Sequence, residues 1–168
     1  MGIYERILLP TDGSAGVEGV IDHAAELARV HDASIQALYV VDATSFTGLP
    51  METSWEGVRD VLKSEGETAL EQVERLAPDD VTVETATVEG TPSTEIVRYT
   101  REQPVDTVVM GTHGRGGIDR LLLGSVAERV VRKSAVPVVT VPVSETAETE
   151  SEEVVEADPD AVSSPESS

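Results

Sequence analysis

The chain has 168 residues, the length of one domain, and no cysteine, which excludes disulfide bonds, zinc-thiolate sites and thiol catalysis. Hydrophobic residues make up 39% of the sequence and aromatic residues only 3%, so the core must be built from aliphatic side chains. The formal net charge of −20, from 32 acidic against 12 basic residues, disfavours binding to nucleic acid and to anionic membranes.

The predicted domain, residues 1–143, alternates strands with helices. The strands are expected at 3–10, 34–41, 82–89, 106–110 and 136–141, and the helices at 15–31, 54–77, 92–103 and 125–134. Continuous Val, Ile and Leu strands between helices indicate an α/β fold with a parallel sheet covered on both faces. Ligands of such sheets bind beyond the carboxyl ends of strands where the strand order reverses, so the ends to inspect are 10–13 and 111–114.

Capping residues predict where two of the helices begin. Ser14 is a candidate N-cap for the helix at 15–31. Thr91 is a candidate N-cap followed by Pro92 at the first helical position, and this segment is interpreted as a helix start and nothing more. Residues 42–53 are predicted to form a loop.

The composition changes sharply after Val143. Residues 145–168 contain nine acidic residues, no Lys and no Arg, with too little apolar content to order themselves. We predict a disordered acidic tail over 144–168. The tail holds only nine of the 32 acidic residues, so the folded part is acidic as well.

The basic residues indicate adaptation to salt. Ten are Arg, and only Lys63 and Lys133 are Lys. A strongly acidic surface stays soluble in concentrated salt, where its self-repulsion is screened. We therefore expect a halophilic source, and the alternative is an ordinary acidic protein with an acidic tail.

The beginning of the chain carries no targeting signal that we recognise. Residues 1–6 run into a strand without a basic region or an apolar stretch, and no apolar run reaches the length of a membrane span. The expectation is a cytoplasmic protein that binds neither membranes nor nucleic acid.

A glycine-rich segment, MGTHGRGGIDRLLLGS at 110–125, joins the fourth predicted strand to the fourth predicted helix. Gly111 leaves room for a ligand beside the strand end, and Gly114 allows a turn whose N–H groups point at an anion. Arg115 adds a positive charge to the segment. The Walker pattern and the G-x-G-x-x-G pattern are both absent.

The end of this segment opens a helix. Gly124 and Ser125 stand where free N–H groups and the positive end of the helix dipole attract anions. Ser125 is also followed by Glu128, which is a capping box that any helix can use. With the glycines beside it, we interpret Ser125 as both a cap and a phosphate ligand.

Two other candidate residues have ordinary interpretations. Asp12 lies in Thr-Asp-Gly-Ser, a common turn sequence, and only its place after the first strand distinguishes it. His113 is interpreted as a loop side chain or a ribose contact rather than a catalytic base. No His, Asp and Glu grouping has metal-ligand spacing, so Mg²⁺ would arrive only with the phosphates of a nucleotide.

The spacing of Gly111, Gly114, Gly124 and Ser125 resembles the pattern of the nucleotide-binding members of the universal stress protein family, without departure. The resemblance covers about residues 3–142. It extends to the strings ILLPTDGS, ALYVVD and GSVAERVVRKSAVPVVTV.

The resemblance implies an open five-stranded parallel sheet, Rossmann-like, in the strand order 3-2-1-4-5, with ATP at the ends of strands one and four. Asp12 would approach the adenine or ribose, Val40 would contact adenine through its backbone, and Pro10 and Thr11 would shape the base pocket. The remaining residues expected at the nucleotide are Met110, Gly111, His113, Gly114, Arg115, Gly124, Ser125 and Val126.

The resemblance also implies a homodimer formed through the last strand, 136–141. An exposed apolar edge strand is an aggregation hazard unless it is paired, so a dimer is physically sensible.

Three functions are compatible with the sequence. The first is a stress-response protein in which ATP, AMP or ADP is a structural or signalling ligand for a partner not yet identified. The second is a slow ATPase or phosphotransferase, which lacks a Walker lysine and an evident base for the γ-phosphate. The third is an interaction module independent of nucleotide; residues 42–53 are then a candidate partner surface, or alternatively a lid.

Overall fold

The computed structural model describes residues 2–14, 16–42, 55–113 and 123–143. Strands and helices alternate through these ranges as predicted, with ends that differ by a few residues. The elements are β1 Arg6–Pro10, α1 Val17–His31, β2 Ser34–Val41, α2 Trp55–Leu76, β3 Val83–Glu89, α3 Pro92–Glu102, β4 Thr107–Gly111, α4 Ser125–Lys133 and β5 Val138–Val141.

The strands form one parallel sheet in the order β3-β2-β1-β4-β5, which confirms the order implied by the family resemblance. β1 lies in the middle, with β2 on one side and β4 on the other. The chain therefore adds β2 and β3 on one side of β1, then returns and adds β4 and β5 on the other side. This reversal places a crevice at the carboxyl end of β1.

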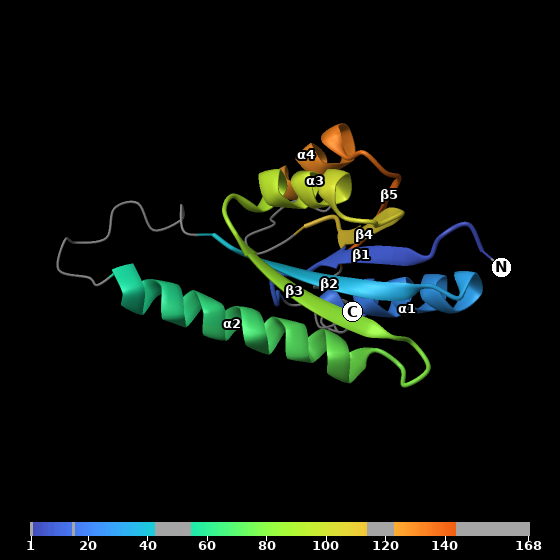
Figure 1. Cartoon of the computed structure of the whole chain (residues 1–168), viewed down its shortest axis with the longest axis horizontal. Helices are drawn as coiled ribbons and strands as arrows, with labels where there is room; N and C mark the ends of the chain where they lie inside the picture. The colour runs from blue at the N-terminus through green and yellow to red at the C-terminus, as the bar shows by residue number, and fades with distance from the viewer. Residues whose placement is uncertain (1, 15, 43–54, 114–122, 144–168) are drawn as a thin grey trace, which may run out of the picture.

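Helices cover both faces of the sheet, as predicted: α1 and α2 lie on one face, and α3 and α4 lie on the other (Figure 1). Successive side chains of β1 alternate between the two layers. Ile7 and Leu9 join the core under α1 and α2, whereas Leu8 joins the core under α3 and α4, and all three are 0% exposed. Burial on both faces explains why this strand is a continuous apolar run.

The start of α1 differs from the prediction. The N-cap is Gly16, in the left-handed region with φ 86°, and the helix begins at Val17. The turn before the helix requires a positive φ, which glycine adopts without strain. Ser14 stands too early to cap the helix, and its amide instead donates to the Asp12 carboxylate at 2.9 Å. The prediction that Ser14 caps α1 is wrong.

Neither α3 nor α4 has a side-chain hydrogen bond at its N-cap. Thr91 and Pro92 occupy the N-cap and first helical positions, as predicted, but Thr91 makes no side-chain capping bond. In α4 the N-cap is Gly124, and Ser125 is already the first helical residue. The predicted capping box between Ser125 and Glu128 is therefore wrong, because a capping side chain must stand one residue earlier.

Two predicted segments are not part of the described structure: nearly all of the loop at 42–53, and the acidic tail at 144–168. Within the ranges that are described, no helix is long and apolar enough to cross a membrane.

Candidate functional site

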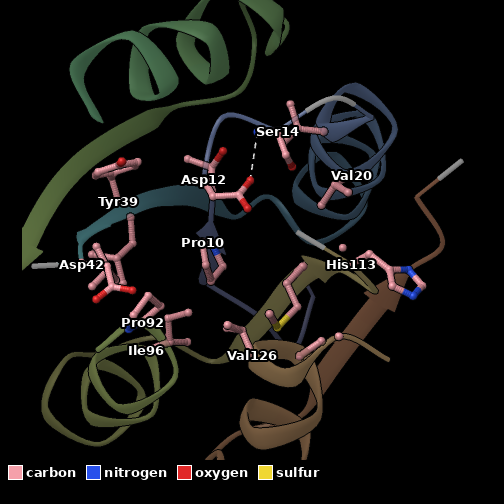
Figure 2. A pocket seen from close by; sticks show the side chains of 18 of the residues that line it. Pro10, Asp12, Ser14, Val20, Tyr39, Asp42, Pro92, Ile96, His113 and Val126 are labelled. Atoms are coloured by element: carbon pink, nitrogen blue, oxygen red, sulfur yellow. Dashed lines mark hydrogen bonds between the residues drawn. The ribbon is translucent and has the colours of Figure 1, made fainter. Parts of the chain in front are cut away.

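A cavity of about 510 Å³ lies at the carboxyl edge of the sheet, at the end of β1. Its walls come from the ends of β1, β2 and β4 and from the first turns of α1, α3 and α4 (Figure 2). Binding sites for small molecules typically measure about 300–1,000 Å³, so the cavity is large enough for one. It stands at the point predicted from the reversal of strand order.

Ten of the twelve predicted site residues line this cavity. They are Pro10, Thr11, Asp12, Val40, Met110, Gly111, His113, Gly124, Ser125 and Val126. The other two, Gly114 and Arg115, lie outside the described residues.

The cavity also has lining residues that the sequence did not suggest. Pro92 and Ile96 come from the first two turns of α3, Tyr39 comes from the end of β2, and Asp42 follows it (Figure 2). Glu65 comes from the middle of α2. The others are Ser14, Val17, Val20, Leu38, Leu62, Ala127 and Val143.

Some of these additional lining residues could have been predicted from the topology. In a parallel α/β sheet every helix starts at the carboxyl edge, so the first turn of each helix is a candidate wall of the site. That rule would have included Pro92, which we interpreted only as a helix start.

The first turn of α4 supplies unpaired backbone donors. The Gly124 amide donates to the Thr112 carbonyl at 2.7 Å, so it is not one of the free N–H groups that the sequence analysis counted. The first intrahelical bond runs from the Glu128 amide to the Gly124 carbonyl at 2.9 Å. Between them, the amides of 125–127 have no hydrogen-bond partner among the described residues. Unpaired N–H groups at a helix N-terminus attract anions, so this turn is a candidate anion site.

A second unpaired backbone group lies on the opposite wall, at Val40. Alternate residues of β2 bond to β1, and the last bond of that ladder runs from the Thr11 amide to the Leu38 carbonyl at 2.9 Å. The next residue of β2 whose backbone N–H and C=O point toward β1 is Val40. Because β1 ends at Pro10, opposite Leu38, no β1 residue pairs with Val40. In the described chain, neither the N–H nor the C=O of Val40 has a hydrogen-bond partner.

Acidic side chains also line the cavity. Asp12, Asp42 and Glu65 contribute carboxylates, and the described lining contains no Lys or Arg. The Asp12 carboxylate accepts the Ser14 amide in a tight turn, which fixes its position (Figure 2). Attraction for an anion in the described part of the cavity therefore comes from peptide dipoles.

His113 marks the side of the cavity remote from Tyr39 and Asp42 (Figure 2). Its Nδ1 lies 3.0 Å from the Thr112 hydroxyl, and that hydroxyl accepts the Val143 amide at 3.4 Å. The Nε2 atom is buried and has no partner within the part of the chain that is described. A buried polar atom left unpaired costs about 1–3 kcal/mol, so this nitrogen favours a hydrogen-bonding ligand beside it.

Comparison with known proteins identifies the family. Residues 3–142 match the model of the universal stress protein family. The chain is 44% identical over 140 residues to a universal stress protein of Methanocaldococcus jannaschii, which covers 83% of this chain and 82% of the relative. It is 31% identical over 147 residues to one of Bacillus subtilis, at coverages of 83% and 99%.

Solved structures agree in fold. The structure of a second Methanocaldococcus jannaschii universal stress protein superposes with a TM-score of 0.73 at 30% identity, covering 83% of this chain and 96% of that one. A universal stress protein of Lactobacillus plantarum superposes with a TM-score of 0.70 at 25% identity, at coverages of 82% and 97%. The chain belongs to the universal stress protein family.

Proposed function

We propose that this universal stress protein binds an adenine nucleotide, foremost ATP, as a structural or signalling ligand in a stress response. The observation that carries the proposal is the set of three unpaired amides at 125–127 facing a cavity with a second unpaired backbone group at Val40. Polar groups at both ends and apolar walls between them suit a ligand with an anionic end and a flat, hydrogen-bonding end.

The base would lie at the Val40 end. Adenine presents an amino donor and ring-nitrogen acceptors, which complement one C=O and one N–H. Pro10 and Ile96 supply apolar walls on either side, and the fixed Asp12 carboxylate accepts hydroxyl groups of a ribose placed beside it.

The phosphates would lie at the α4 end. Each hydrogen bond from a backbone amide to a charged oxygen contributes about 1.5–3 kcal/mol, and three such amides are available at 125–127. The Ser125 hydroxyl and the unpaired Nε2 of His113 add two further polar groups, and Gly114 and Arg115 complete the proposed site.

Two other universal stress proteins of this fold were solved with adenine nucleotides. One is in complex with cAMP, with a TM-score of 0.60 at 23% identity, and one from Archaeoglobus fulgidus is in complex with dAMP, with a TM-score of 0.61 at 22% identity. The ligand class proposed here is the class that those two proteins hold.

The proposed role is binding rather than turnover. Mg²⁺ would be held mainly by the phosphates, because the described residues contain no group of three or more His, Asp or Glu side chains placed to hold a metal ion.

We further propose that the protein forms a homodimer through β5. This strand pairs with β4 on one side, and all four of its residues are half-buried in the single chain. Val138, Val139 and Val141 make its surface apolar, so pairing with β5 of a second copy would cover an edge that is otherwise prone to aggregation.

The charge and composition support two further proposals, one on the cellular environment and one on the tail. A charge of −20 with only two lysines suits a halophilic cytoplasm, where molar salt screens the repulsion. The acidic tail at 144–168 is proposed to be disordered, because its composition provides too few apolar residues for a core.

The proposed function is tested by what the protein carries and what stabilises it. Protein purified without added nucleotide is denatured, and the released small molecules are identified by mass spectrometry. Thermal unfolding is then followed with increasing ATP, with GTP as the matched control. A ligand at 100 times its Kd stabilises by about 2.7 kcal/mol, which gives a clear rise in Tm. No copurifying nucleotide together with no rise at millimolar ATP would contradict the proposal.

A further inference from the structure

The two helical layers of this acidic protein carry charge of opposite sign. Helices α1 and α2 hold nine acidic side chains against four basic ones. Helices α3 and α4, on the other face of the sheet (Figure 1), hold three acidic side chains against five basic ones. The α3–α4 layer is therefore a positive surface on a chain whose net charge is −20.

Five exposed cations make up this surface, which we call the basic face: Arg98, Arg101, Arg129, Arg132 and Lys133. The C-terminal ends of the two helices adjoin, because the Arg101 guanidinium donates to the Lys133 carbonyl at 3.5 Å. Arg129 and Lys133 stand one turn apart on α4, so the cations are neighbours rather than scattered charges.

Carboxylates neutralise only part of the basic face. Arg98 pairs with Glu95 at 3.1 Å, and Arg132 pairs with Glu128 one turn earlier on α4. Among the described residues, no carboxylate lies within ion-pair distance of Arg101, Arg129 or Lys133. Three neighbouring cations are thus available for an acidic partner.

The chain supplies such a partner itself. The described structure ends at Val143, which lines the same cavity as Ser125, the first residue of α4. Residues 144–168 begin at that point and carry nine carboxylates and no Lys or Arg. The nine residues of α4 span about 14 Å, whereas 25 residues of extended chain reach about 80 Å, so the tail can pass along the whole helix.

We propose that the acidic tail at 144–168 docks on the basic face of the same chain. Tethering at Val143 gives the tail carboxylates an effective concentration in the millimolar range at this surface, which no separate acidic partner has. A docked tail is held apart from the acidic α1–α2 face, and this lowers the self-repulsion of the chain. The contact is electrostatic, so it forms at low ionic strength and weakens in the molar salt of the proposed cytoplasm.

The two lysines of the chain make a direct test possible. Lys133 lies on the basic face and Lys63 lies on α2, and both are exposed. A carbodiimide joins carboxylates to lysine amines without a spacer. The intact protein is treated at low salt as an equal mixture of ¹⁵N-labelled and unlabelled chains, digested, and analysed by mass spectrometry for tail residues joined to either lysine.

The expected product joins tail carboxylates to Lys133 within single-isotope peptides, several-fold more often than to Lys63. Its yield should fall in about 1 M KCl, where the Debye length is about 3 Å. Arg129→Glu should lower the yield at Lys133 several-fold, whereas the matched reversal Arg75→Glu on α2 should not. Equal joining to Lys63, the absence of any product with the tail, or products that mix isotopes, which would mean the tail of another copy, would overturn the proposal.

Discussion

The Gly124 amide and the Thr112 carbonyl are joined by a hydrogen bond of 2.7 Å, which closes the glycine-rich segment at its two ends. This bond holds the first turn of α4 against the end of β4 through backbone atoms alone. It also uses the Gly124 amide, which the sequence analysis had counted among the free donors. The unpaired amides of the proposed anion site therefore begin one residue later, at Ser125.

The first prediction isolates the Ser125 amide. Proline is favoured at the first position of a helix, and Gly124 before it has φ −63° and ψ 162°, which a residue preceding proline adopts readily. Ser125→Pro therefore removes one N–H and one hydroxyl without breaking α4. We expect ATP affinity to fall about 10- to 100-fold, because a hydrogen bond to a charged group contributes about 1.5–3 kcal/mol.

Ser125→Ala is the matched control, since it removes the hydroxyl and keeps the amide. Titration calorimetry of both variants with ATP separates the two groups. If Pro and Ala at this position bind ATP equally, the amide does not hold the phosphates.

The second prediction concerns the space beside Gly124. Its φ of −63° is open to any residue, so glycine is not needed there for backbone conformation. In Gly124→Ala, a weaker N-cap and a less flexible unfolded chain act in opposite directions, and the free energy of unfolding should change by less than about 1 kcal/mol. We expect ATP affinity to fall, because Gly124 lines the cavity and an added methyl group would crowd a phosphate bound beside it. Urea unfolding and calorimetry measure the two effects, and unchanged affinity would show that no phosphate approaches this residue.

Much of the fold follows from the sequence because its signals are local. Ile7–Leu9 is an uninterrupted apolar run, and its side chains are fully buried because β1 is central. A similar run of valines forms β5, which is half-buried at the edge, so an apolar run locates a strand without giving its place in the sheet. The order 3-2-1-4-5 required the family resemblance.

The lining of the cavity was predictable where it depends on strand ends and glycines, and less so elsewhere. Glu65 reaches the cavity from the middle of α2 because of how that long helix lies across the sheet, and no local pattern signals this. The start of α1 was missed because Ser14 fits a common N-cap pattern, whereas the turn requires the positive φ of Gly16. Both features depend on tertiary geometry.

A third prediction tests the dimer proposed through β5. In a parallel strand, the backbone N–H and C=O groups of successive residues point in turn to the two neighbouring strand positions. The Val141 carbonyl accepts the Thr112 amide, so Val141 points toward β4. The N–H of Thr140 therefore points to the open edge of the sheet. Thr140→Pro removes that edge donor and leaves the bonds to β4 in place. Sedimentation velocity should show loss of the dimer in this variant and its retention in Thr140→Ala. A dimer that survives the proline would mean that another surface forms the interface.

A fourth prediction uses the ion pair that ties α1 to the turn after α2. Arg29 donates to both carboxylate oxygens of Asp80, at 2.9 and 3.0 Å, and these bonds lower the pKa of Asp80 below its ordinary value. A lowered pKa gives stability that is present above the unfolded-state pKa and is lost as the pH falls through the folded-state pKa. Asp80→Asn should therefore lower Tm slightly at neutral pH. The difference should close in strong acid and shrink in molar KCl, because both side chains are exposed.

The last prediction concerns salt. With 32 acidic and 12 basic residues, the folded chain repels itself at low ionic strength, and the Debye length falls from about 10 Å at 0.1 M to about 3 Å at 1 M. Thermal unfolding should therefore show Tm rising steadily with KCl. In a variant with Glu56, Glu67, Glu71 and Glu74 changed to Gln, all exposed on α2, the low-salt Tm should be higher and the rise smaller, since less repulsion remains to be screened. If the Tm of the natural chain does not change with KCl concentration, charge repulsion does not limit its stability, and the halophilic interpretation is wrong.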